Sequence, residues 1–493
     1  MHLTTLDFVV IVAYLGGLTL IGLHFSKQQT SREEYLLGSR NVHWLLAAGS
    51  VLATLLSTIT FLALPGETIR YGIAFSLGLI ALPLVVPVVN YILLPVLMSL
   101  RITSMYEYLE RRFDVRARSL AATVFTARTL LWMGLVIYTC SFAVTTMTGW
   151  NIYWTIVVLG VVTTFYTSAG GMRTVIWTDN LQLWILGGGA IAIPIYIGVS
   201  IGSGPAAWWD AFSAAGHTKI EVFSWDLTIR LTVIGAMMSQ FFWNACTNGS
   251  DQVAVQRFLS TPSLAAARRS MWSYMGMNFA LNFLLVFCGL ALFAFYHHRS
   301  GLAPAAFQAE IALKADRVMP EFIVQELPAG ISGLVLAALL AAAMSSLSSG
   351  INSISGVVGT DFIERHNWVG ESGMLRASKI VSVVAGAAGV LVALGVTYAS
   401  QRTDWNLVEL TQRVNHLTVG PIAVLFFSGI LFRRAGFGAA GAGFLTGLLV
   451  SLFVAFGKEL FGLPQSVSFT WLVPFSFSAG FAAAGLASLI VRR

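Results

Sequence analysis

Residues 50–61 read SVLATLLSTITF, and five of these side chains carry a hydroxyl group: Ser50, Thr54, Ser57, Thr58 and Thr60. The sequence around them is apolar from about residue 41, over the roughly 20 residues that a membrane-spanning helix needs. A helix that faces lipid is apolar all round, so hydroxyl groups inside a span mark an interior cavity or a contact between helices. We therefore expect this span to lie inside a bundle and to be interrupted.

The whole chain has the composition of a membrane protein. Of its 493 residues 56% are hydrophobic and only 10% are charged, whereas about a quarter of a soluble domain is charged. This excludes a soluble enzyme, a coiled coil and a disordered chain. Apolar runs predict an all-α integral membrane protein of about thirteen transmembrane helices. They begin near residues 6, 41, 72, 118, 153, 175, 229, 271, 328, 377, 405, 435 and 468. The connectors are too short to fold alone, so we expect one integral domain over residues 1–493.

A second polar cluster interrupts the seventh predicted helix. Residues 243–252 read WNACTNGSDQ, and such a segment cannot form an uninterrupted apolar helix. Two broken helices at corresponding positions of two halves point to a transporter built from inverted repeats. Helices two and seven predict a five-plus-five repeat, with one helix before it and two after it. The predicted segments are a leading helix 6–25, repeats 41–201 and 229–432, and trailing helices 435–456 and 468–490.

A third cluster, AAAMSSLSSGINSISG at residues 341–356, is rich in serine. Ser345, Ser348 and Ser349 stand at positions i, i+3 and i+4, so their hydroxyl groups share one helix face, with Ser346 beside them. Sodium is a hard cation, and hydroxyl groups plus carbonyl oxygens freed by a broken helix can hold it weakly enough for release. The alternative is that the small residues only let two helices pack closely.

Charged residues within or near the spans give further expectations. Asp179, in WTDNLQ, is either a functional intramembrane carboxylate or an acid at the interface that cytoplasmic water reaches. Arg128 and Arg413 lie at membrane depth and are interpreted as side chains near helix ends that snorkel to the interface. The excess of Lys and Arg in alternate connectors, including residues 257–270 with Arg257, predicts an outside N-terminus and a cytoplasmic C-terminus.

Several segments together resemble the sodium:solute symporter family, from about residue 6 to residue 450. Those that carry the resemblance are SREEYLLGSRNVHW, LLSTITFLALPGETIRYG, SMYEYLERRFDVRARS, YTSAGGMRTVIWTDNLQ, DQVAVQRFLS and ELPAGISGLVLAALLAAAMSSLSSGINSISG. The family's fold is the same five-plus-five repeat with a helix in front. Its members couple sodium to the transport of sugars, sialic acid, proline, monocarboxylates, vitamins or iodide.

The resemblance implies two sodium sites. The common site takes main-chain oxygens matching Ala53, Leu56 and Ala342 and hydroxyl groups matching Ser345 and Ser346. The sialic acid type has a second site, whose ligands match Asp179, Ser345, Ser348 and Ser349. Both patterns are complete in this sequence, so coupling to one or two sodium ions is expected.

The solute residues fit no single branch of the family. Ser57 and Thr60 match contacts to the substrate carboxylate in the sialic acid type, but the arginine of that type falls on Trp132. Asn244 and Gln412 match amides that bind sugar hydroxyl groups, but the glutamate of the sugar type falls on Leu79. Neutral donors and acceptors favour an uncharged, polyhydroxylated solute over a strong anion, whereas LPGETIRYG resembles the monocarboxylate, vitamin and iodide branch.

The expected function is sodium-coupled symport of a small polar solute, sugar-like or sialic acid-like, into the cell by alternating access. The expected protein is a monomer in the cell (inner) membrane, with no nucleic-acid partner and sodium as its coupling ion. An anion symporter is the alternative within this class, and a solute sensor or channel the alternative outside it. A membrane enzyme is not expected, because the sequence has no HExxH motif or paired carboxylates.

Overall fold

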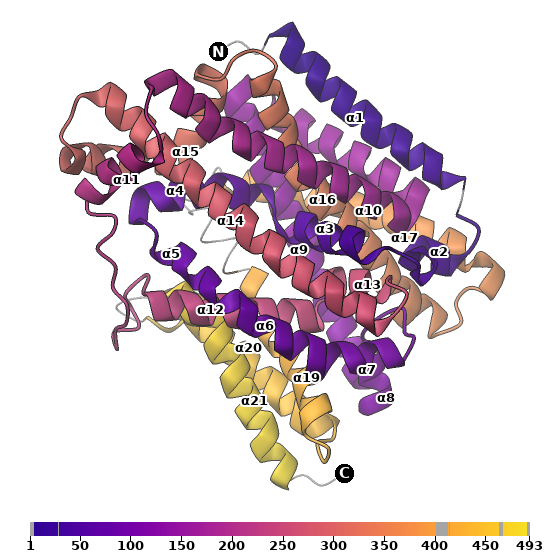
Figure 1. The fold of residues 1–493 in the computed structure, drawn as a ribbon. Helices are drawn as coiled ribbons and strands as arrows, with labels where there is room; N and C mark the ends of the chain where they lie inside the picture. The colour runs from indigo at the N-terminus through magenta and orange to yellow at the C-terminus, as the bar shows by residue number, and fades with distance from the viewer. Residues whose placement is uncertain (1–3, 28, 401–412, 414, 463–466, 491–493) are drawn as a thin grey trace.

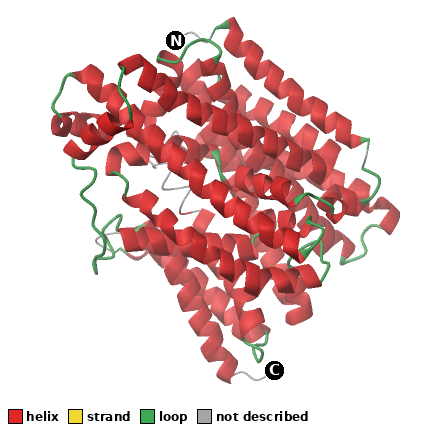
Figure 2. Cartoon of the chain, in the orientation of Figure 1, coloured by secondary structure: helices red, strands yellow, loops and turns green. Residues whose placement is uncertain are grey.

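The computed structural model describes residues 4–27, 29–400, 413, 415–462 and 467–490. Within these ranges every regular element is a helix (Figure 2). Nine of the described helices are long and apolar enough to cross a membrane, and the bent pair of α3 and α4 adds a tenth. Several of them are α1 (Thr5–Ser26), α9 (Val115–Thr148), α14 (Leu264–Ser300), α17 (Met374–Ser400), α20 (Phe437–Phe461) and α21 (Leu472–Ile490). The all-α membrane architecture is confirmed.

Four predicted spans take a different form in the structure. The spans expected near residues 153 and 175 are joined as α10 (Ile152–Ile201), which kinks at Gly171. The span expected near residue 229 is α12 (Val233–Ser250), whose polar residues lower its hydropathy. The span expected near residue 405 is represented by the short apolar helix α19 (Val419–Leu431), because most residues before it lie outside the described ranges.

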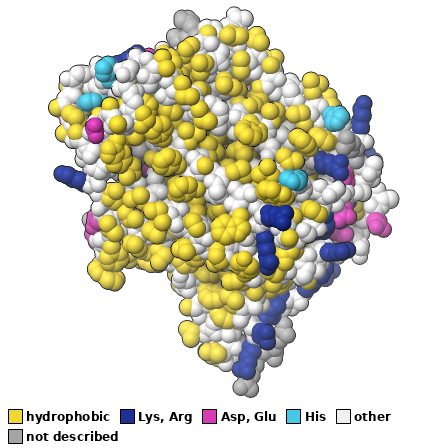
Figure 3. All heavy atoms as spheres, viewed as in Figure 1, with side chains coloured by type: hydrophobic (Ala, Val, Ile, Leu, Met, Phe, Trp, Pro, Cys, Tyr) yellow, Lys and Arg dark blue, Asp and Glu magenta, His cyan; other side chains and the backbone are white. Residues whose placement is uncertain are grey.

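Short helices connect the spans at the two ends of the molecule. They are α2 (Arg32–Leu37), α8 (Glu107–Arg112), α11 (Pro205–Ala214) and the longer α15 (Pro304–Gln325). In contrast, α5 (Ala74–Leu77), α6 (Leu82–Val88) and α7 (Leu94–Ser99) follow one another within a single apolar span, Ala74–Ser99. Figure 1 shows α11 and α15 at one end and α2, α7 and α8 at the other. On the face in Figure 3, hydrophobic side chains cover most of the surface and most Lys and Arg gather toward the second end.

The serine-rich segment forms the central helix, α16 (Ile331–Val357). Every residue from 335 to 357 is buried, and the helix contacts α1, α3, α4, α9, α10, α13 and α17. Its many Ala, Ser and Gly residues let these neighbours approach closely. The start of α16 is held by Asp7 of α1, whose Oδ1 accepts hydrogen bonds from the main-chain N–H of Gly330 (2.8 Å) and Gly333 (2.7 Å).

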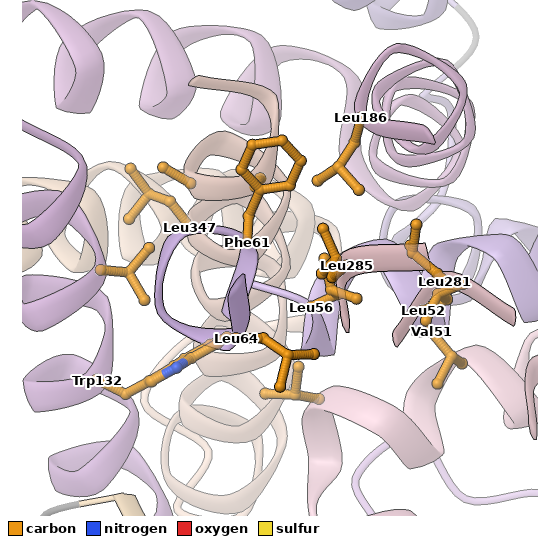
Figure 4. Close-up of a cluster of buried hydrophobic side chains, with 14 of the residues drawn as sticks. Val51, Leu52, Leu56, Phe61, Leu64, Trp132, Leu186, Leu281, Leu285 and Leu347 are labelled. Atoms are coloured by element: carbon orange, nitrogen blue, oxygen red, sulfur yellow. The ribbon is translucent and has the colours of Figure 1, made fainter. Parts of the chain in front are cut away.

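Both predicted interruptions are present. The first lies at Leu56 and Ser57, between α3 (Trp44–Leu55) and α4 (Thr58–Tyr71), whose axes differ by 62°. The second lies at Asp251, between α12 and α13 (Gln252–Leu259), where the backbone is extended. In Figure 4, apolar side chains on both sides of the first break, including Leu52, Leu56 and Phe61, lie among leucines of α10, α14 and α16. Packing therefore fixes the break in place.

Candidate functional site

The end of α3 presents main-chain oxygens to the serines of α16. The last carbonyl groups of a helix have no partner within it, and here two of them accept hydrogen bonds from α16. Ser345 Oγ donates to Ala53 O at 2.7 Å and also lies 3.2 Å from Ala342 O. Ser346 Oγ donates to Thr54 O at 2.8 Å.

A narrow gap lies where these groups meet. Ala53, Leu56, Ala342 and Ser345 line it, together with Gln182 and Leu186 among others. Four of the five positions predicted for the first sodium site thus border one space, and Ser346 lies beside it on α16. Thr54 O, the partner of Ser346, could not be predicted from the sequence, because any residue type supplies a main-chain oxygen. Neutral oxygens in this number are what a weakly held alkali cation needs.

Asp179 of α10 lies at the centre of a second polar cluster. Its side chain is fully buried, so cytoplasmic water does not reach it, and the interpretation as an interfacial acid is wrong. Ser50 Oγ donates to Asp179 Oδ2 at 2.5 Å, and Ser349 Oγ lies 3.4 Å from the same oxygen. Ser348 Oγ instead donates to Ser345 O at 3.0 Å. Oδ1 of Asp179 has no hydrogen-bond partner among the described residues.

Arg257 completes this cluster, which corrects its expected place in a cytoplasmic connector. Its Nη2 lies 3.8 Å from Asp179 Oδ2 and donates to Ser349 Oγ, and its Nε donates to Ser50 Oγ at 3.2 Å. Both charged side chains are fully buried. Arg257 lies in α13, which continues the broken helix to Leu259, so the connector starts later than expected. The apolar run at this point of the sequence is too short to predict that continuation. The signal in the sequence that could have indicated this pairing is Asp179 itself, because a buried carboxylate needs a counter-charge.

The predicted solute residues lie on three described helices. Ser57 is the N-cap of α4 and makes no side-chain capping hydrogen bond, and Thr60 lies in the first turn of the same helix. Trp132 is buried on α9, which contacts α4. On α12, the amide nitrogen of Asn244 donates to Gln240 O at 2.9 Å, and Tyr274 OH donates to Asn244 Oδ1 at 3.4 Å.

The structure thus brings only some of these positions together. Ser57, Thr60 and Trp132 lie on adjacent helices, and Ser57 directly follows Leu56 of the narrow gap. No hydrogen bond between described residues joins Asn244 to them. Gln412 lies outside the described residues.

The two arginines expected to snorkel are both paired. Arg128 is 7% exposed on α9, and its Nη2 lies 2.5 Å from Asp251 Oδ2. Arg413 Nη1 lies 2.9 Å from Glu459 Oε1 of α20. The expectation was wrong for Arg128 because α9 extends from Val115 to Thr148, which puts this residue well inside the helix.

Comparison with known proteins identifies the scaffold. The sodium:solute symporter family model matches residues 35–450. The chain belongs to this family. Among the symporter's relatives, the sodium/sialic acid symporter SiaT of Proteus mirabilis (strain HI4320) is 32% identical over 461 residues, which cover 92% of this chain and 90% of the relative. Human sodium-coupled monocarboxylate transporter 1 is 31% identical over 463 residues, covering 92% and 74% respectively.

A solved structure agrees with this assignment. A sodium-coupled sialic acid symporter in a substrate-bound, outward-open state superposes on the symporter with a TM-score of 0.88 and 29% identity, over 99% of this chain and 98% of the other. A nucleobase-cation-symport-1 transporter, at a TM-score of 0.56 and 13% identity, shares the fold alone. The protein is therefore a sodium-coupled symporter with the five-plus-five inverted-repeat fold, and not an enzyme. Sodium is its coupling ion and a small molecule its solute.

Proposed function

We propose that the symporter carries a small organic acid into the cell together with sodium. The observation that carries this proposal is the first turn of α4. Its N-terminal N–H groups have no side-chain cap, and a helix N-terminus has a partial positive charge that favours carboxylates. Half-helices at membrane depth bind anionic solutes in this way in other transporters. The helix end offsets part of the charge lost where Trp132 stands in place of an arginine.

An acid fits the contacts better than the uncharged solute that the neutral side chains favoured. The amide of Asn244 already bonds Gln240 and Tyr274, so it is not a free donor waiting for sugar hydroxyl groups. The relatives named above are described as sialic acid and monocarboxylate transporters. Sialic acid and short monocarboxylates are therefore the two solute types to test first, with sugars as the neutral comparison.

Sodium would link α3 to α16 through the narrow gap. In the proposed cycle Ser345 and Ser346 turn their hydroxyl groups so that lone pairs face the ion, beside the main-chain oxygens of Ala53, Leu56 and Ala342. Leu56 and Ser57 are adjacent, so fixing one orders the other at the solute end. Linked sites of this kind typically couple by about 1–3 kcal/mol. Asp179 with Ser345, Ser348 and Ser349 is the proposed second site, where sodium would share the carboxylate with Arg257.

The remaining proposals concern topology and assembly. In a cell (inner) membrane, the N-terminus lies outside and the C-terminus lies in the cytoplasm. This orientation places the connectors with the excess of Lys and Arg on the cytoplasmic side. One chain acts as a monomer, because both sodium sites and the described solute positions lie within it.

The test is a binding and uptake screen. Purified protein is heated with sialic acid, lactate or glucose, in sodium or in choline, because a ligand that binds the folded state raises the unfolding temperature. Hits are then assayed for uptake into proteoliposomes. We expect an acid to stabilise the protein and to accumulate only with sodium. Sodium-dependent binding and accumulation of glucose alone would refute the proposal.

A further inference from the structure

The buried ion pair of Arg128 and Asp251 lies on the cytoplasmic side of the proposed solute residues. Arg128 is one helical turn from Trp132 on α9, about 6 Å toward the start of the helix. Since α9 begins at Val115 on the proposed cytoplasmic side, Arg128 lies nearer to that side than Trp132 does. The pair is 7% and 8% exposed. Buried charges in membranes are costly and mark functional paths by default.

A polar strip on α12 leads to this pair. Asn244, Thr247, Asn248 and Asp251 stand at positions i, i+3, i+4 and i+7, so they share one face of the helix and its end. All four are buried. Thr247 Oγ1 and Asn248 Oδ1 have no hydrogen-bond partner among the described residues. Unpaired polar groups of this kind are expensive inside a protein unless something else binds them.

At its end, the strip is next to a contact between Gln252 and the connector around residues 103–105, which lies on the proposed cytoplasmic side. Gln252, next to Asp251, accepts a hydrogen bond from Met105 N at 2.9 Å and donates to Thr103 O at 3.0 Å. The ion pair therefore lies between the solute residues above and a closed contact below. A separation of α13 from this connector would break the two hydrogen bonds of Gln252 and would also move Asp251, its neighbour in the chain.

The pair is arranged so that its members can part. Within the described residues, the hydrogen bond of Arg128 is the one from Nη2 to Asp251, and its buried Nε has no partner. A guanidinium has five N–H donors in a fork that fits a carboxylate. Asp251 is held separately, since its Oδ1 accepts from Val253 N at 3.0 Å and caps α13. Asp251 thus keeps a partner when Arg128 takes another.

We propose that Arg128 is a second binding residue for the carboxylate of the transported acid, on the cytoplasmic side of the solute site. Asp251 neutralises Arg128 until the acid arrives, and the acid's carboxylate then replaces Asp251 on the guanidinium before release. This rests on the proposed function, because a neutral solute would gain nothing from the exchange. It also explains how a transporter with Trp132 in place of an arginine still handles an anion.

The experiment compares acid binding with acid turnover. Wild type, Arg128→Lys, Arg128→Gln and the double variant Arg128→Gln/Asp251→Asn are reconstituted in proteoliposomes, using the acid found in the screen. The double variant removes both charges, so it leaves no unpaired buried charge to unfold the protein. Arg116→Gln is the control for losing a positive charge on α9, because Arg116 is exposed and pairs with Asp114.

We expect the double variant to bind the acid in sodium within about threefold of wild type, while its turnover number falls about tenfold or more. Arg128→Lys keeps the positive charge, so we expect it to retain part of the turnover that Arg128→Gln loses. Wild-type turnover in the double variant overturns the proposal and leaves the proposed function intact. Loss of sodium-dependent binding together with turnover also overturns it, by making the pair structural. If wild type moves no acid at all, the proposed function itself fails.

Discussion

Ser345 and Ser346 differ from other buried serines of α16 in the partners of their hydroxyl groups. Both donate to main-chain oxygens at the broken end of α3. Ser355, equally buried on the same helix, donates to Ser378 O of α17 at 2.7 Å. All three are serines of one helix. Comparing variants of Ser345 and Ser346 with a variant of Ser355 therefore distinguishes an ion-binding role from ordinary helix packing.

The first prediction concerns the sodium requirement. Ser346→Ala removes one proposed ligand worth about 1 kcal/mol, so the sodium concentration for half-maximal uptake should rise about fivefold. Uptake into proteoliposomes is measured over a range of sodium concentrations at fixed solute. Ser355→Ala should leave that concentration unchanged. Equal sodium curves for Ser346→Ala and wild type would remove Ser346 from the site.

The second prediction concerns the buried pair of Asp179 and Arg257. Either single change, Asp179→Asn or Arg257→Gln, leaves an unpaired buried charge and should destabilise the protein by about 3–5 kcal/mol. The double change should recover much of that loss. Thermal unfolding in detergent measures it, with sodium present and absent. A double variant as unstable as the worse single variant would show that the two charges do not compensate each other.

At the residue scale, the sequence could predict which hydroxyl groups share a face but not which partners they meet. Periodicity put Ser345, Ser348 and Ser349 on one side of a helix. It could not show that Ser348 bonds within its own helix, or that Arg257 reaches Asp179. Those contacts depend on how far α13 continues beyond the break, which is a packing outcome with no local signal.

At the scale of the element, α10 shows how one residue shapes a span. Gly171 has φ 57° and ψ −154°, which L side chains rarely adopt, and an added Cβ would lie 2.7 Å from Tyr35 O. The kink separates two apolar stretches that the sequence predicted as separate helices. The prediction of a boundary there was sound, although the chain passes through it without a loop.

The third prediction tests this kink. Gly171→Ala should destabilise the protein by about 1–3 kcal/mol from backbone strain alone, and by more if Tyr35 cannot shift. Gly188→Ala in the same helix is the matched control, because nothing lies within 4 Å of its added Cβ. Thermal unfolding of the two variants is compared under one set of conditions. Similar unfolding temperatures would show that the kink does not require glycine.

Across the whole molecule, composition and the positions of two breaks predicted the class and the repeat. The positions of the helices along the sequence were sufficient to predict the repeat, because hydrophobic spans are long and their interruptions are rare. The details of the solute site could not be predicted in the same way, since its residues come from several helices whose register only packing decides. The repeat limits 41–201 and 229–432 remain predictions.

The fourth prediction concerns coupling between the sites. If sodium and solute favour the same conformation, each must raise the affinity for the other by the same factor. Titrating solute at several sodium concentrations, and sodium at several solute concentrations, should give one shared factor of about 5 to 150. A solute affinity that does not change with sodium would contradict coupled binding.

The central claim is that an alkali cation binds between the end of α3 and the serines of α16. Equilibrium binding of radioactive sodium to the purified protein tests it most directly, with Ser345→Ala/Ser346→Ala compared with Ser355→Ala. The account predicts saturable binding in wild type and in Ser355→Ala, and loss of the main binding component in the double variant. Undiminished sodium binding by the double variant would contradict it.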